Sequence, residues 1–241
     1  MNTKTQRKTV ALYGGSFNPP HEGHFGMAQY IHDSIKPDEV WFLYSDNVWK
    51  DPNGYAPLHH RIKMGEIMAE NYPDYPFVMS DIQHQIGIHL THDVLTVLRK
   101  KFPDTDFIWV MGADNLAVFH KWDDYDKIIE STPIAVVDRA GYTDKALDGY
   151  AALTYNHLKT DTPTDLKQGT AGWCFLKPPH INMASSSLLK DLKRGVTSFD
   201  GPFQKVADYI INHGLYDVPK PQMPSQTGAR KRFRAQKNTP F

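Results

Sequence analysis

The strongest constraint on the fold is an alternation of two hydrophobic periodicities along the chain. Short apolar runs rich in β-branched and aromatic residues recur, and segments with the spacing of amphipathic helices fill the intervals between them. Strands that alternate with helices need crossover connections, which place the strands parallel in one sheet. The runs that predict strands are Thr9–Tyr13, Glu39–Tyr44, Phe77–Met79, Phe107–Met111, Pro133–Val137 and Trp173–Leu176.

The helical segments complete an α/β architecture. Apolar residues share one helical face in three of them: Leu58, Ile62, Gly65 and Met68; Thr91, Val94, Leu95 and Leu98; Phe203, Val206, Ala207, Ile210 and Ile211. We therefore expect a single Rossmann-like, doubly wound parallel sheet of about six strands with helices on both faces, plus a C-terminal helical part. Such sheets bind ligands at the carboxyl ends of their strands near the topological switch point, so the loops after the first and fourth strands are the candidate binding loops.

Charge divides the 241-residue chain into a body and two arms. The formal net charge is zero, but residues 1–8 and 219–241 hold nine of the 27 basic residues and no acidic ones, which leaves residues 9–218 with a net charge of −9. We expect a disordered basic arm over 1–8, one domain over 9–218 and a disordered basic tail over 219–241. An acidic body does not favour nucleic acid as a partner.

Other compositional features point to a soluble protein of a reducing compartment. Cys174 is the single cysteine, so no intramolecular disulfide can form. The apolar runs are short, and the polar, basic segment from Met1 to Lys8 has no hydrophobic signal region behind it. We expect a cytoplasmic protein without a membrane partner. The sequence leaves the oligomeric state open, including a homo-oligomer.

The segment after the first predicted strand carries the clearest chemistry. Gly14 and Gly15 let the backbone approach a phosphate closely, and the helix that follows presents free N–H groups to it. His21 and His24 are three residues apart, which places both imidazoles on one face if the first helical turn includes them. Taken alone, the pair is more typical of two core histidines beside a glycine-rich turn. A metal site would need a third ligand, and the nearby sequence suggests none.

Gly14–His24, which reads Gly-Gly-Ser-Phe-Asn-Pro-Pro-His-Glu-Gly-His, resembles the histidine signature of the α/β nucleotidyltransferases. The residue sequence of this segment is similar to that of the bacterial nicotinate-nucleotide adenylyltransferases, which usually have an aspartate at the position of Asn18. That exchange keeps an acceptor oxygen but removes a charge. The resemblance extends over about residues 9–216.

Two further segments fit the same family in the expected order. Trp109–Trp122 looks like the Gly-Ala-Asp stretch with a downstream Phe and Trp, and it implies that Asp114 binds the ribose of ATP and that Trp122 stacks on a pyridine ring. Ala184–Lys190 is similar to a serine-rich helix start that receives the outer phosphates, with Lys190 where the family has an arginine.

Weaker similarities complete the expected site. Lys50 falls where the family has a lysine, and either it or Arg61 could meet the acceptor phosphate; otherwise both would be solvated surface charges. Thr91 lies in a stretch that resembles a family Tyr-Thr-x-Asp-Thr-Leu motif, with Val94 in place of a threonine. By resemblance, the mononucleotide-binding residues are Asn18, Lys50, Arg61, Thr91 and Trp122, and the ATP-binding residues are Gly14, Gly15, Ser16, Phe17, Gly23, His24, Gly112, Asp114, Ser185, Ser186, Ser187 and Lys190.

The reaction that the resemblance implies is attack of the phosphate of nicotinate mononucleotide on the α-phosphorus of ATP, which forms deamido-NAD and releases pyrophosphate. His21, His24 and Lys50 would be the catalytic residues, with Mg²⁺ as cofactor held mainly by ATP phosphates and water. Two alternatives stay open. One is another phosphorylated acceptor, such as nicotinamide mononucleotide or phosphopantetheine, and the other is a nucleotide-binding module without catalysis.

Overall fold

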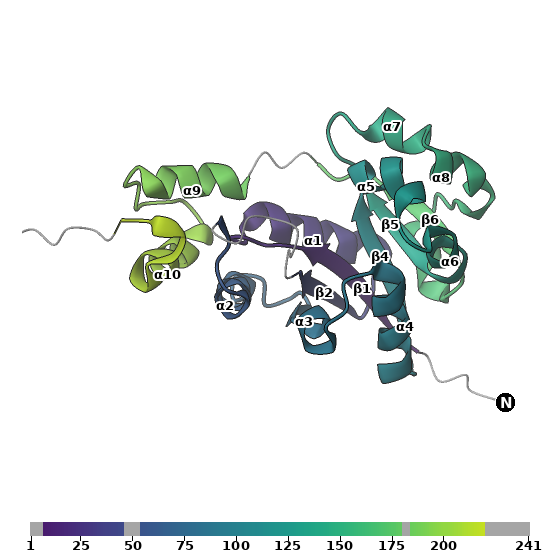
Figure 1. Ribbon diagram of the computed structural model, residues 1–241, viewed down its shortest axis with the longest axis horizontal. Helices are drawn as coiled ribbons and strands as arrows, with labels where there is room; N and C mark the ends of the chain where they lie inside the picture. Colours follow the sequence, from purple (N-terminus) through teal and green to yellow (C-terminus); the bar gives the residue numbers. More distant parts are fainter. Residues whose placement is uncertain (1–6, 46–53, 180–183, 220–241) are drawn as a thin grey trace, which may run out of the picture.

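A parallel six-stranded sheet forms the centre of the protein in a computed structural model that describes residues 7–45, 54–179 and 184–219 (Figure 1). All six predicted strands are confirmed. They run in the order β3-β2-β1-β4-β5-β6, so the order reverses between β1 and β4. The strands are β1 (Lys8–Gly15), β2 (Glu39–Tyr44), β3 (Phe77–Ser80), β4 (Thr105–Gly112), β5 (Pro133–Val137) and β6 (Gly172–Leu176).

Helices cover both faces of the sheet, as expected for a doubly wound fold (Figure 1). The α-helices of the described residues are α1 (Glu22–Ile35), α2 (Leu58–Ala69), α3 (Ile82–Ile86), α4 (Thr91–Lys101), α5 (Ala113–Val118), α6 (Tyr125–Ser131), α7 (Thr143–Leu147), α8 (Tyr150–Thr154), α9 (Ser185–Lys193) and α10 (Phe203–His213). Four short 3₁₀ turns join them in that part of the chain: η2 (Phe119–Lys121), η3 (Asn156–Leu158), η4 (Pro163–Gln168) and η5 (Leu215–Asp217).

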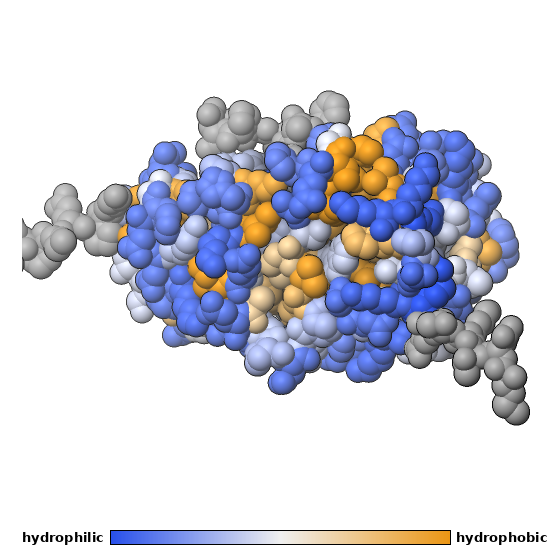
Figure 2. Space-filling view, turned by 90° about the horizontal axis from the view of Figure 1, so that it is seen from below, coloured by the Kyte–Doolittle hydropathy of each residue, from blue (hydrophilic) through white to orange (hydrophobic). Residues whose placement is uncertain are grey.

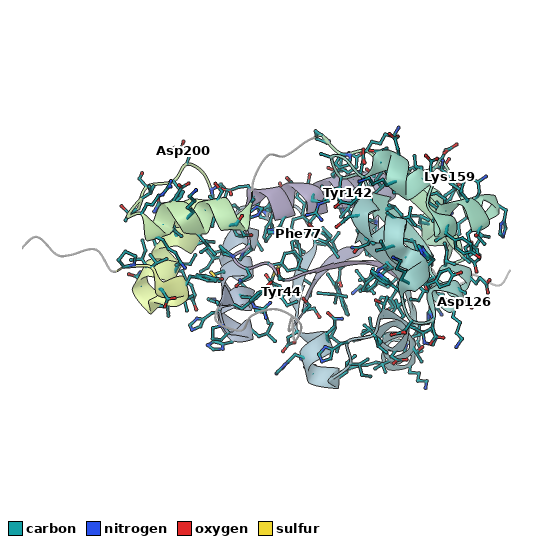
Figure 3. The ribbon with its side chains drawn as sticks, turned by 45° about the horizontal axis from the view of Figure 1, so that its top comes forward. Tyr44, Phe77, Asp126, Tyr142, Lys159 and Asp200 are labelled. Carbon is teal, nitrogen blue, oxygen red and sulfur yellow. The ribbon has the colours of Figure 1, made fainter. Side chains whose placement is uncertain are left out.

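The alternation of side chains along each strand supplies two separate cores. On β2, Phe42 and Tyr44 pack under α1, α2 and α10, whereas Leu43 packs on the opposite face with α3 and α4. Tyr44 and Phe77 lie in the interior of the molecule in Figure 3, while Asp126 and Lys159 lie at its edge. The C-terminal helical part, α9 and α10, belongs to the same core as α1, because Leu192 and Phe203 pack in one cluster with Phe25.

One face of the molecule is mostly hydrophilic, with some apolar residues exposed. Figure 2 shows hydrophilic residues over both ends of one face, with apolar residues exposed between them. None of the helices in the described residues has the length and apolar character that crossing a lipid bilayer requires.

The predicted helix faces are mostly confirmed, with one shift on α2. Its fully buried residues are Arg61, Met64, Gly65 and Met68, and Ile62 is only partly buried. A Cβ atom at Gly65 would collide with the Tyr44 hydroxyl, so the helix approaches β2 closely only because this position has no side chain.

We therefore predict that Gly65→Ala destabilises the protein, although alanine is the better helix former. Overpacking against Tyr44 should lower the free energy of unfolding by about 1–3 kcal/mol. Urea denaturation measures this change. Gly54→Ala is the control, because a Cβ atom at Gly54 would meet nothing within 4 Å. Equal stabilities for the two variants would contradict the packing described.

Candidate active site

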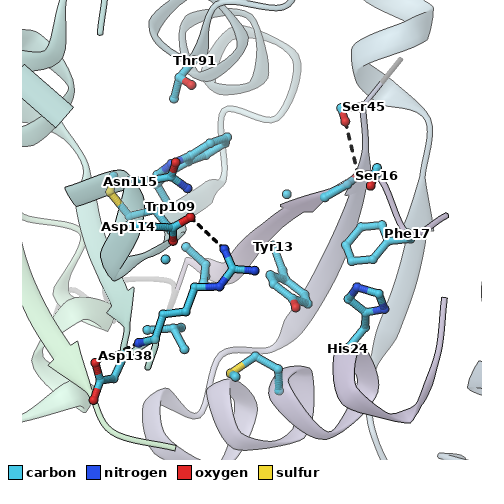
Figure 4. Close-up of a pocket in the computed structure, with 18 of the residues that line it drawn as sticks. Tyr13, Ser16, Phe17, His24, Ser45, Thr91, Trp109, Asp114, Asn115 and Asp138 are labelled. Atoms are coloured by element: carbon cyan, nitrogen blue, oxygen red, sulfur yellow. Dashed lines mark hydrogen bonds and ion pairs between the residues drawn. The ribbon is translucent and has the colours of Figure 1, made fainter. Parts of the chain in front are cut away.

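A cavity of about 800 Å³ opens at the carboxyl ends of β1 and β4, where the order of the strands reverses. Its volume is in the range of pockets that enclose a small organic ligand. In Figure 4, Asp114 and Asp138 lie on one side, Phe17 and His24 on the other, and Tyr13 between them. The expected residues that line it are Gly14, Gly15, Ser16, Phe17, His24, Thr91, Gly112, Asp114 and Trp122.

The loop after β1 folds back on itself. Phe17 has a positive φ of 44° and is 1% exposed, and its ring packs against Tyr13 and His24. A Cβ atom at Gly15 would lie 2.7 Å from that ring. Gly15 therefore makes room for Phe17, in addition to the backbone access that the sequence suggested.

The two histidines lie together at the start of α1, as predicted. His21 is the N-cap residue, and its ring centroid is 3.9 Å from that of His24. His21 Nδ1 accepts the Gly23 N–H at 3.1 Å, and His24 Nδ1 accepts the His21 N–H at 3.3 Å. Because each Nδ1 is an acceptor, each neutral ring carries its hydrogen on Nε2. His24 lines the cavity, whereas His21 and Gly23 are not among its lining residues.

Both imidazoles are strongly biased toward the neutral form. Burial lowers the pKa of His21 to about 4. Burial, assisted by the nearby charges of His21 and Arg139, lowers the pKa of His24 to about 3. The pair therefore offers N–H donors at neutral pH without fixed positive charge.

The loop after β4 has the same kind of arrangement as the loop after β1. A Cβ atom at Gly112 would collide with the Asp114 carboxylate, so this glycine lets the carboxylate fold back over the strand end. Asp114 Oδ2 accepts a hydrogen bond from Arg139 at 2.7 Å, and Asp114 Oδ1 is buried without a hydrogen-bond partner. Trp109 Nε1, in the cavity wall, is likewise buried and unpartnered.

Arg139 is a candidate functional residue that the sequence analysis missed. It lies two residues after β5, lines the cavity, and keeps its side chain 66% exposed while paired with Asp114. Among the described lining residues it is the one lysine or arginine. The rule that ligands meet the carboxyl ends of parallel strands, applied to β5 as well, would have found it.

The rest of the lining is aromatic and polar. Trp122 follows η2, and its ring packs edge-on against Phe119, with 5.3 Å between the ring centroids. Thr91 begins α4, and Gln83 and Asn115 also line the cavity; neither of these two was expected from the sequence. The lining thus combines the Asp114–Arg139 ion pair with the aromatic ring of Trp122.

Arg61 occupies neither of the places that were expected. It does not line the cavity, and it is no solvated surface charge, because it is 3% exposed. Its guanidinium donates to the carbonyl oxygens of Ala56 at 3.0 Å, Ser16 at 2.8 Å and Ser45 at 3.0 Å. A buried charge requires such partners, and these contacts join the ends of β1 and β2 to the start of α2.

Asn18 is also directed away from the cavity lining. Its Oδ1 accepts hydrogen bonds from the Ala56 N–H at 3.1 Å and the Tyr216 hydroxyl at 2.7 Å, and its Nδ2 donates to the Gly54 carbonyl at 2.9 Å. An aspartate could not make the last bond. The difference from the family pattern at this position thus matches its local surroundings.

The serine-rich helix start lies against the β1–α1 loop. The hydroxyl of Ser185 donates to the Pro19 carbonyl at 2.9 Å. Ala184 is the N-cap residue of α9, so no serine caps the helix as a serine-rich start suggested. Ser186, Ser187 and Lys190 are exposed and do not line the cavity. The remaining expected residue, Lys50, lies outside the described residues.

The lowered histidine pKa values predict a dependence of stability on pH. In the unfolded chain a histidine binds its proton near pH 6.5, whereas His24 in the native protein does not until about pH 3. Stability should therefore fall as the pH drops below about 6.5. Between pH 7.5 and 5, the wild type should lose roughly 1–2 kcal/mol more than His24→Gln, which has no proton to bind.

Urea denaturation at both pH values measures this difference. His157→Gln serves as the control, because His157 is exposed and lies far along the chain in η3. A pH dependence of His24→Gln equal to that of the wild type would show that His24 is not buried in its neutral form.

Comparisons with known proteins agree with this geometry. A family model described as cytidylyltransferase-like matches residues 12–192. The probable nicotinate-nucleotide adenylyltransferase of Brucella abortus (strain 2308) is 36% identical over 186 residues, which cover 76% of this chain and 94% of the relative. The protein of the same name from Rhizobium meliloti (strain 1021) is 37% identical over 184 residues, with 74% and 96% covered.

Solved structures share the fold. The nicotinic acid mononucleotide adenylyltransferase of Plasmodium falciparum, complexed with APC, aligns with a TM-score of 0.62 at 20% identity and covers 88% of this chain and 98% of its own. The same protein complexed with NaAD aligns equally well. From the family match and the curated relatives together, the chain belongs to the cytidylyltransferase-like family and, within it, to the nicotinate-nucleotide adenylyltransferases.

Proposed function

We propose that the protein transfers the AMP part of ATP to nicotinate mononucleotide, forming deamido-NAD and pyrophosphate in the biosynthesis of NAD. The observation that carries this proposal is one cavity at the switch point whose lining brings together His24, Arg139 and Trp122. The names of the curated relatives support the same reaction.

Trp122 suits the pyridine ring, and the Asp114–Arg139 pair suits ATP. Trp122 offers a flat ring for stacking, and Thr91 and Asn115 in the same lining offer hydrogen bonds. Asp114 can accept from the ribose hydroxyls, and Arg139 can bind a phosphate. The α-phosphorus would then lie near His24.

The chemistry needs no protein nucleophile, because the acceptor phosphate attacks the α-phosphorus directly. The protein lowers the barrier by aligning the two phosphates and by stabilising the charge that develops on the α-phosphate oxygens. The Nε2–H of His24 can donate a hydrogen bond to such an oxygen. His21 holds the His24 ring in place, because its backbone N–H donates to His24 Nδ1 and the two rings are in contact. Lys50 would add a cation.

We propose that Mg²⁺ is the cofactor and arrives with ATP, held mainly by phosphate oxygens and water, where it would neutralise charge on the triphosphate. In the described ranges, no three histidine, cysteine or acidic side chains converge to form a metal site. The single cysteine agrees with the reducing environment of the cytoplasm, where we place the enzyme.

The histidine assignment predicts a large loss of turnover in His24→Ala. Loss of one transition-state donor should reduce kcat by about 10²–10³-fold, while the fold is retained. Pyrophosphate release and the circular dichroism spectrum measure the two properties, and His157→Ala is the control. Near-normal turnover in a folded His24→Ala protein would refute the assignment.

The same assay distinguishes the candidate acceptors. We expect release of pyrophosphate with nicotinate mononucleotide in preference to nicotinamide mononucleotide and phosphopantetheine. Preference for another acceptor would correct the substrate, and no release with any acceptor would favour a nucleotide-binding module without catalysis.

The ion pair of Arg139 with Asp114 predicts a selective effect on ATP. Arg139→Ala should raise the KM for ATP by about tenfold, the value of one charge-assisted hydrogen bond, with little change in the KM for nicotinate mononucleotide. Arg7→Ala is a matched control, since Arg7 pairs with Asp106 at 2.9 Å at the amino end of the sheet. Equal effects on both KM values would contradict the placement of ATP beside Arg139.

A further inference from the structure

The C-terminal turn reaches back to the loop that carries the histidines. In η5, the Tyr216 hydroxyl donates to Asn18 Oδ1 at 2.7 Å, across 198 positions of the sequence. Tyr216 lies beyond residue 192, where the match to the family model ends. Asn18 is three residues before His21, in the only connection between β1 and α1.

The backbone around Tyr216 adopts left-handed conformations. Gly214, Tyr216 and Asp217 all have positive φ, at 63°, 59° and 55°. Left-handed conformations are unfavourable for residues with a side chain, and they persist where surrounding contacts demand them. The contact here is partly buried. Burial raises the pKa of Tyr216, so its hydroxyl remains a hydrogen-bond donor at neutral pH.

Tyr216 acts within a network that fixes the whole loop. Asn18 uses its remaining bonds on Gly54 and Ala56, and the guanidinium of Arg61 holds the carbonyls of Ala56 and Ser16. The loop is thereby tied to α2 and to the C-terminal turn. Each tie restrains the angle at which the chain enters the cap at His21.

We propose that Tyr216 is a positioning residue that, through Asn18, holds the β1–α1 loop so that His21 and His24 keep their geometry. The proposal rests on the proposed function where it concerns turnover. It does not depend on that function where it concerns the loop itself, because the capping bonds at Gly23 and His21 exist without substrate.

Tyr216→Phe removes the hydroxyl and keeps the ring. We expect kcat to fall by about tenfold, as misplaced groups lower turnover, with both KM values within about twofold of wild type. The amide hydrogens of His21 and Gly23 should exchange at least several-fold faster. Tyr209→Phe is the matched control, because Tyr209 on α10 also loses one hydrogen bond, to His60 at 2.9 Å, away from the loop.

A double-mutant cycle with Asn18→Ala separates positioning from general destabilisation. If the hydroxyl acts through Asn18, the double variant should have the kcat of Asn18→Ala alone. Additive losses, or a kcat for Tyr216→Phe equal to that of Tyr209→Phe, would overturn the proposal. If the wild type forms no deamido-NAD, the proposed function fails. Unchanged amide exchange at His21 and Gly23 in Tyr216→Phe would then by itself overturn the positioning role of Tyr216.

Discussion

A buried positive charge holds the loops of the site together. The Arg61 guanidinium would cost several kcal/mol to bury without partners, and it is satisfied by carbonyl groups from three separate segments. Those carbonyls belong to the ends of β1 and β2 and to the start of α2. Because each must stay within hydrogen-bond reach of one rigid, planar group, the segments cannot move independently. The cavity is bounded by loops braced in this way.

Two glycines make space in the site because they have no side chain. Gly15 leaves space for the ring of Phe17, and Gly112 leaves space for the carboxylate of Asp114. In both loops the glycine precedes, by two residues, the side chain that folds back over it. The two neighbouring parallel strands thus end in the same arrangement of a glycine and a side chain that folds back. This arrangement brings one aromatic and one acidic side chain to opposite walls of a single cavity.

The sheet and its helices could be predicted because they depend on periodicity, which is local. The strands, the face of α10 and the pairing of His21 with His24 all follow from spacing within a few residues. The burial of Arg61 and the bonds of Asn18 could not be predicted, because their partners are distant in sequence and leave no periodic trace. Arg139 lies between these cases: its position after a strand was readable, but its pairing with Asp114 was not.

The contacts between the two ends of the chain have a consequence for synthesis. Pro19 is bound by a serine 166 positions later, and the Glu22 carboxylate accepts the Phe203 N–H at 2.7 Å, 181 positions later. A growing chain on the ribosome therefore carries its histidine loop long before the segments that hold it have been made. These two contacts can therefore form only after α9 and α10 have been synthesised.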